Sequence, residues 1–279
     1  MNKFYSLGVL GACLCLFACG KDEGTAQVVE ESSPQAVEIV GEEVTYEANG
    51  TVLKGYIAYD ASAGPRPGVL VVHEWWGHND YVRDRARMLA EMGYTAFALD
   101  MYGDGKVANH PEDAQKFMME VLANLDAAEA RFRAAKSVLQ KHPSTDPDDI
   151  AAIGYCFGGA VVLHMARSGE DLDAVASFHG SLGTQSPAQP GMIKARLLVA
   201  NGADDPFVPA EEVEAFKAEM DAAGADMKFI SYPGVVHSFT RPGATEIGEQ
   251  FDMPLRYDEA ADKDSWSELT LLLSESFDN

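Results

Sequence analysis

The chain has 279 residues, of which 47% are hydrophobic, so it is long enough to bury the core of one large α/β domain. Its formal net charge at pH 7 is -23. A surface this acidic excludes nucleic acid and anionic membrane surfaces as electrostatic partners.

The chain begins with a segment that is typical of a bacterial export signal. Residues 1–18 contain Lys3 as their only charge, and the apolar core that follows is too short for a stable membrane span. The four residues Leu-Phe-Ala-Cys that end at Cys19 resemble a lipobox, and a second candidate, Leu-Gly-Ala-Cys, ends at Cys13. We therefore expect residues 1–18 to be a lipoprotein signal peptide and Cys19 to carry the lipid.

A polar segment separates the leader from the rest of the chain. Residues 19–41 are acidic and poor in aromatic residues, which favours a flexible tether over packed structure. A single folded domain is expected over residues 42–279. Together these features predict a protein of the cell envelope, periplasmic or outer-membrane associated, that meets the membrane only through its lipid anchor.

Strand and helix patterns alternate within the domain, which predicts a mostly parallel sheet with helices on both faces. A leading antiparallel strand pair is expected from residues 44–46 and 52–59, on either side of an Asn49-Gly50 turn. The expected parallel strands are residues 69–72, 95–99, 149–155, 174–178, 197–200 and 228–230. The expected helices are residues 83–92, 112–140, 160–168, 209–222 and 266–273. Chemistry in such sheets gathers at the carboxyl ends of the strands.

The third of these parallel strands ends in a pattern typical of a nucleophile elbow, with Cys156 at the position of the nucleophile. In such a turn the residues two before and two after the nucleophile must be small, and Gly154 and Gly158 satisfy this requirement. The other three cysteines of the chain lie at positions 13, 15 and 19. After processing at Cys19, Cys156 would be a lone thiol in an oxidising compartment, which indicates a reactive group. The alternative is a buried structural cysteine beside a glycine-rich turn.

Two partners for this thiol follow later strands. Asp205 lies in the loop after residues 197–200, and His237 follows the last strand. The order nucleophile, acid, histidine is that of the α/β-hydrolases. An imidazole can generate a thiolate, and a carboxylate fixes the orientation and tautomer of the imidazole. Asp204 is an alternative acid, and either aspartate could instead be a turn or helix-start carboxylate.

With the segment from His73 to Gly77, these motifs resemble the dienelactone hydrolase family of α/β-hydrolases. The resemblance runs from about Val52 to the last helix. Its motifs are His73-Glu74-Trp75-Trp76-Gly77, Gly154-Tyr155-Cys156-Phe157-Gly158-Gly159, Asp205-Pro206-Phe207-Val208-Pro209 and His237-Ser238-Phe239. The resemblance implies an α/β-hydrolase fold and a catalytic triad of Cys156, Asp205 and His237.

The same resemblance implies roles for three further residues. Glu74 would interact with the resting thiol and help to convert it to the thiolate once substrate binds, which would limit oxidation of the thiol. The alternative for Glu74 is a salt-bridged loop acid. The backbone N–H groups of Trp75 and Phe157 would form the oxyanion hole.

The chain departs from the family pattern where substrate carboxylates are bound. One of two family arginines matches Arg241, whereas the other falls in the loop after Tyr102, where this chain has Asp104 and Lys106. Lys106 lacks the bidentate geometry of a guanidinium, so we expect Arg241, Lys106 and Tyr102 to bind substrate but do not expect dienelactone itself. His110, in the same loop, either lines the pocket or is a solvated loop histidine.

The sequence indicates no metal site and no cofactor, because its histidines lack metal-ligand spacing and no dinucleotide or phosphate loop is present. We therefore predict a monomeric hydrolase that cleaves a small ester or lactone through a thioester intermediate. Acyl transfer or peptide hydrolysis on the same triad is one alternative. A binding protein that retains the fold without turnover is another.

Overall fold

The computed structural model describes residues 37–277. The predicted signal peptide, Cys19 and most of the predicted tether lie outside this range. The described residues form one eight-stranded sheet with the strand order β1-β2-β4-β3-β5-β6-β7-β8. Strands β1 and β2 are antiparallel to each other, β2 is antiparallel to β4, and every other neighbouring pair is parallel. This confirms the predicted mostly parallel sheet with a leading antiparallel pair.

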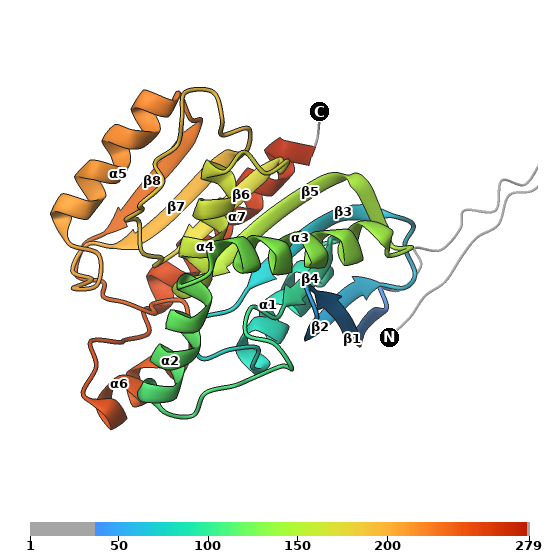
Figure 1. The fold of residues 1–279 in the computed structure, drawn as a ribbon, viewed down its shortest axis with the longest axis horizontal. Helices are drawn as coiled ribbons and strands as arrows, with labels where there is room; N and C mark the ends of the chain where they lie inside the picture. Colours follow the sequence, from blue (N-terminus) through green and yellow to red (C-terminus); the bar gives the residue numbers. More distant parts are fainter. Residues whose placement is uncertain (1–36, 278–279) are drawn as a thin grey trace, which may run out of the picture. The chain divides into compact units, whose positions relative to one another are not determined.

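The strands are β1 (Ile39–Ala48), β2 (Thr51–Asp60), β3 (Arg66–Val72), β4 (Thr95–Leu99), β5 (Thr145–Tyr155), β6 (Ala174–Phe178), β7 (Arg196–Gly202) and β8 (Met227–Tyr232). The helices are α1 (Asp80–Glu91), α2 (Pro111–Leu122), α3 (Leu125–Lys141), α4 (Phe157–Arg167), α5 (Ala210–Ala223), α6 (Ala244–Phe251) and α7 (Glu259–Phe277). Figure 1 shows how these elements are arranged in space.

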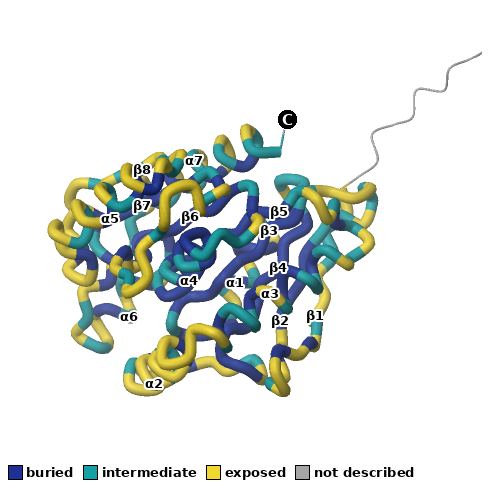
Figure 2. Tube along the Cα trace, turned by 45° about the horizontal axis from the view of Figure 1, so that its top comes forward, coloured by how far each residue is buried: buried dark blue, intermediate teal, exposed yellow. Residues whose placement is uncertain are grey.

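Helices cover both faces of the sheet because its central strands are apolar on both sides. Val69 and Val71 of β3 pack into one core with α1 and α7, whereas Leu70 and Val72 pack into a second core with α3, α4 and α5. Figure 2 shows the central strands as buried and much of α2 as exposed. Because both faces of the central strands are buried, the parallel strands consist of continuous apolar runs in the sequence.

Three features differ from the sequence-based expectations. The helix expected over residues 112–140 is two helices, because Asn124 caps the start of α3 with its side chain, which accepts a hydrogen bond from the N–H of Ala127 at 3.1 Å. Helix α6 was not anticipated. Strand β1 begins at Ile39, inside the segment 19–41 predicted as a tether.

No helix within residues 37–277 is long and apolar enough to cross a membrane.

Candidate active site

The structure places Cys156 on a sharp turn between β5 and α4. Its backbone has φ 54 and ψ -116, a conformation that residues other than glycine rarely adopt. Its N–H donates to the carbonyl of Phe178 at 3.0 Å, and its carbonyl accepts from Ala160 at 3.2 Å. The thiol is partly exposed, so a substrate can reach it.

Close backbone packing explains the glycines around this turn. A Cβ atom on Gly154 would overlap the carbonyl oxygen of Gly158, and one on Gly158 would overlap the carbonyl oxygen of Val72. The turn can therefore form only where these two side chains are absent. The first N–H groups of a helix have no partner within the helix, so the N–H of Phe157 is free to stabilise negative charge beside Cys156.

His237 and Asp205 meet at the carboxyl end of the sheet. The Nδ1 atom of His237 lies 2.7 Å from Oδ2 of Asp205, and both side chains are buried. Burial opposes the charged imidazolium, but the negative charge of Cys156 and hydrogen bonds with Asp205 and Cys156 outweigh it and raise the pKa of His237 from 6.5 to about 10. The alternative acid, Asp204, is exposed, and its backbone N–H donates to the carbonyl of Val235 at 3.0 Å.

Two aromatic rings flank the His237 ring. The rings of His179 and Phe207 each lie with their centroids 5.1 Å from that of His237, and both contacts are edge-to-face. His179 is fully buried, whereas Phe207 is 47% exposed. His179 was not predicted as a site residue, and its position directly after β6 was the one sequence signal of its place in the site.

Glu74 is held by two neighbours of His237. Its carboxylate accepts a hydrogen bond from Ser238 at 3.1 Å and forms an ion pair with Arg241 at 2.6 Å. The side chain of Glu74 is 1% exposed and that of Arg241 19%. In this arrangement Glu74 is the salt-bridged acid of the alternative interpretation, and Arg241 is occupied by the protein itself.

Tyr102 and His73 hold the loop that carries Trp75. The hydroxyl of Tyr102 donates to the carbonyl of Trp75 at 2.9 Å, and its ring packs against His73 and Phe157. Burial and then the charge of Cys156 raise the pKa of Tyr102 well above 10.0, so its hydroxyl stays protonated and can donate. Tyr102 thus touches the predicted oxyanion loop from within the site.

His73 was not predicted as a site residue. Its Nε2 accepts from the N–H of Met101 at 3.2 Å, so Nδ1 carries the proton and donates to the carbonyl of Glu74 at 2.6 Å. Burial lowers the pKa of His73 from 6.5 to about 4, which keeps both hydrogen bonds intact at neutral pH. The ring thereby joins the loop after β3 to the loop after β4.

The charged side chains of the loop after Tyr102 are exposed. Asp104 pairs with Lys54 at 2.6 Å on the exposed surface, and the ammonium of Lys106 lies 5.5 Å from the centre of the Phe117 ring. His110 caps the start of α2 by accepting from the N–H of Glu112 at 3.3 Å. The carboxylate of Asp104 is thus neutralised by Lys54.

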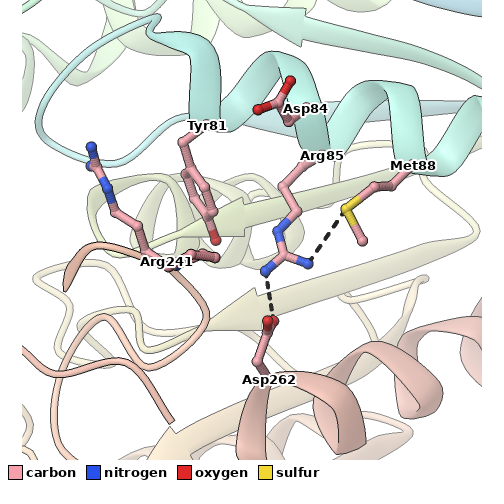
Figure 3. Close-up of a pocket in the computed structure, with 7 residues that line it drawn as sticks. Tyr81, Asp84, Arg85, Met88, Arg241 and Asp262 are labelled. Carbon is pink, nitrogen blue, oxygen red and sulfur yellow. Dashed lines mark hydrogen bonds and ion pairs between the residues drawn. The ribbon is translucent and has the colours of Figure 1, made fainter. Parts of the chain in front are cut away.

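A pocket of about 390 Å³ lies beside this site, lined by Tyr81, Asp84, Arg85, Met88, Arg241, Pro242 and Asp262. Figure 3 shows Tyr81 standing between Arg241 and Arg85. Cys156, Asp205 and His237 do not line this pocket. No group of three or more residues suited to a metal ion is present within residues 37–277.

An elbow at the end of β5, with an acid after β7 and a histidine after β8, defines the class of the α/β-hydrolases. The dienelactone hydrolase family model matches residues 53–277. The chain belongs to this family, and the predictions of the family and of a hydrolytic enzyme are confirmed.

Proteins of known sequence and structure agree with this assignment. The chain is 31% identical to "Protein usf" of Aquifex pyrophilus over 82% of this chain and 95% of that protein. It is 32% identical to an Aquifex aeolicus protein provisionally named carboxymethylenebutenolidase, over 72% and 87% of the two chains. The structure of m3DLH, 37% identical, superposes with a TM-score of 0.80 over 86% of this chain and 99% of its own. That of a dienelactone hydrolase-like promiscuous phosphotriesterase from metagenomic libraries, 34% identical, gives 0.78 over 85% and 98%.

Proposed function

We propose that this hydrolase cleaves a small carboxylic ester or lactone with Cys156 as nucleophile, His237 as general acid and base, and Asp205 as the residue that orients His237. The observation that carries the proposal is the hydrogen bond between His237 and Asp205 at the strand ends, in a fold whose elbow presents Cys156. The Nδ1 atom of His237 is bound by Asp205 at 2.7 Å, and Cys156 and Asp205 together raise the pKa of His237 to about 10. A histidine placed between a thiol and a carboxylate is arranged for proton transfer.

The reaction proceeds in two halves. The Cys156 thiolate attacks the carbonyl carbon, and the N–H groups of Trp75 and Phe157 stabilise the oxyanion of the tetrahedral intermediate. The carbon–oxygen bond to the alkoxide breaks, His237 gives that alkoxide its proton, and a thioester remains on Cys156. His237 then takes a proton from water, the hydroxide attacks the thioester, and the acid leaves while the thiolate is restored.

The ion pair between Arg241 and Glu74 supports a preference for an anionic substrate. Arg241 lies on the same short loop as His237 and is partly exposed, so a substrate carboxylate can compete with Glu74 for its guanidinium. Glu74 would then be a buried carboxylate without its cation, and taking up the proton of the thiol would relieve that cost. Substrate binding and thiolate formation would thereby be linked.

The test is turnover of a panel of esters and lactones by wild type, Cys156→Ala and Cys156→Ser. We expect Cys156→Ala to be folded and inactive, and Cys156→Ser to be strongly impaired, because an alcohol is much harder to ionise than a thiol. Mass analysis after mixing with substrate should detect the thioester on Cys156 only. Wild-type rates in purified Cys156→Ala would refute the proposal.

A second candidate activity is phosphotriester hydrolysis, favoured by the 34% identity to a protein described as a promiscuous phosphotriesterase. A phosphotriester in the same panel tests it, and an amide and an added alcohol acceptor test peptide hydrolysis and acyl transfer. Each of these activities should disappear in Cys156→Ala if it uses the same site.

The cellular location is a separate proposal. We propose that residues 1–18 are removed, that Cys19 is lipidated, and that the hydrolase is held in the cell envelope as a monomer. Stable anchoring requires more than one acyl chain. Mass analysis of the mature amino terminus tests this, and an unmodified start at another residue would refute it.

A further inference from the structure

The ring of His179 is the buried neighbour of the His237 ring. His179 follows β6 directly, is 0% exposed, and packs edge-to-face on His237 at 5.1 Å and 67°. Its backbone has φ 41, in the left-handed region that is costly for a residue with a side chain, and its N–H donates to the carbonyl of Ala200 at 2.8 Å. Such backbone strain is maintained where the surrounding structure requires one side-chain position.

The polar atoms of His179 reveal which nitrogen carries the proton. Nε2 lies 2.8 Å from the hydroxyl of Thr240, whereas Nδ1 is buried and has no hydrogen-bond partner among residues 37–277. A buried N–H without a partner is much rarer than a buried acceptor without one, which places the proton on Nε2. His179 therefore donates to Thr240, and the hydroxyl of Thr240 is left to donate to Tyr81, 2.7 Å away.

Thr240 is in turn held by two helices. Its carbonyl accepts from Arg85 of α1 at 2.5 Å, and Arg85 pairs with Asp262 of α7 at 2.6 Å. The side chains of Arg85 and Asp262 are only 5% and 13% exposed. Figure 3 shows Arg85 reaching from its helix toward Asp262, with Tyr81 beside it. A continuous series of hydrogen bonds thus runs from α7 through α1 and Thr240 to the His179 ring.

The charges around His179 keep it neutral. The titratable groups that face it are His237, Arg85, Tyr155 with a ring centroid 6.1 Å away, and Tyr81 through Thr240. Burial and then the positive charges of His237 and Arg85 lower the pKa of His179 well below 6.5. A neutral aromatic ring can pack against an imidazolium, whereas a second cation would repel it.

We propose that His179, held by Thr240, is a positioning residue that keeps the His237 ring against Asp205 and Cys156. It does not touch the reacting atoms and is not a catalytic residue. This inference rests on the proposed function, because it assumes that the contacts of His237 with Asp205 and Cys156 are those used in catalysis.

The test is the titration of His237 by NMR in the histidine-labelled full-length protein, with kcat and KM on the best ester. Thr240→Val removes the hydroxyl but keeps the shape, and Thr240→Ser keeps the hydroxyl. His179→Phe keeps a ring without the N–H. His237→Gln identifies the resonance. Ser177→Ala is the matched control, because Ser177 is buried on β6 close to His179 and its hydroxyl has no hydrogen-bond partner within residues 37–277.

We expect the His237 midpoint to fall by about one pH unit or more in Thr240→Val and His179→Phe, because a displaced ring loses part of both charged contacts. We expect kcat to fall about tenfold with KM nearly unchanged, as for the loss of one hydrogen bond that maintains a catalytic geometry. Thr240→Ser and Ser177→Ala should behave as wild type.

A lower melting temperature with an unchanged His237 midpoint in both Thr240→Val and His179→Phe would overturn the inference, since it would show a purely structural role. The failure of the proposed function would look different. In that case His237 of the wild-type protein would itself titrate near 6.5, and Asp205→Asn would leave its midpoint unchanged.

Discussion

Cys156 lies on a turn shaped by the backbone of its own neighbours, whereas His237 lies on a loop held by side chains from distant elements. Around Cys156, Gly154 and Gly158 permit the backbone to close on itself and on Val72. Beside His237, residues 238–241 are bonded to side chains from the loop after β3, from α1 and from the end of β6. The proposed nucleophile is therefore fixed by local geometry, and its proposed base is fixed by long-range contacts.

The largest expected effect on activity comes from a substitution that breaks a long-range contact. Asp205→Asn should lower kcat by about a thousandfold to ten-thousandfold, because an amide favours the wrong His237 tautomer while leaving the shape of the loop intact. Steady-state kinetics measures the loss. The matched control is Asp204→Asn, an exposed neighbour, which should retain activity. Equal losses in the two variants would remove Asp205 from its proposed role.

The local half of the site is tested by Gly158→Ala. The added methyl group would overlap the carbonyl oxygens of Val72 and His73, so we expect the free energy of unfolding to fall by about 2–3 kcal/mol. Gly64→Ala is the control, since a Cβ atom there meets nothing within 4 Å and φ is not positive. Denaturant unfolding compares the two. Similar stabilities would show that the backbone does not constrain the elbow.

Arg241→Ala tests whether the loop that carries His237 also selects the substrate. Losing one charged hydrogen bond should lower kcat/KM for acidic esters by about 10-fold to 100-fold. Neutral esters serve as the internal reference, because the variant also leaves Glu74 without its cation. Lys106→Ala, which removes an exposed cation of the loop after Tyr102, should have a smaller effect. Equal losses on acidic and neutral esters would exclude charge recognition by Arg241.

The smallest expected effect is a pH dependence of stability. The pKa of His237 is raised from 6.5 to about 10 in the folded protein, so its stabilising contribution is complete below pH 6.5 and lost as pH rises toward 10. Over this window wild type should lose at least about 1 kcal/mol more than His237→Gln, since one pKa unit corresponds to about 1.4 kcal/mol. Denaturant unfolding at both pH values measures this, and parallel losses would contradict the raised pKa.

The difference between the local geometry at Cys156 and the long-range contacts at His237 explains which features the sequence could predict. The elbow depends on glycines at fixed distances from Cys156 along the chain, and the sheet depends on apolar runs. Both can therefore be predicted from local sequence patterns. Asn124 interrupts a pattern that otherwise continues through residues 112–140, and its effect as a helix cap is easily missed. Only two residues, 123 and 124, separate the two helices, so the expected helical stretch is interrupted but otherwise present.

The contacts that hold the His237 loop could not be predicted from local sequence patterns. His179 and Thr240 are separated by 61 residues, and Arg85 and Asp262 by 177. Nothing in the local composition around these residues indicates that they meet. Arg241 and Glu74 were each identified by resemblance to a family, but their pairing at 2.6 Å became visible only in three dimensions.

Strand β1 forms one edge of the sheet and, within residues 37–277, pairs only with β2. An edge strand of ten residues is a template on which a second chain can add strand by strand. Glu42 and Glu47 are exposed along it, whereas Glu43 is paired with Arg83. A second copy pairing there would bring carboxylates against carboxylates. The acidity of this strand therefore protects the domain from edge-to-edge aggregation.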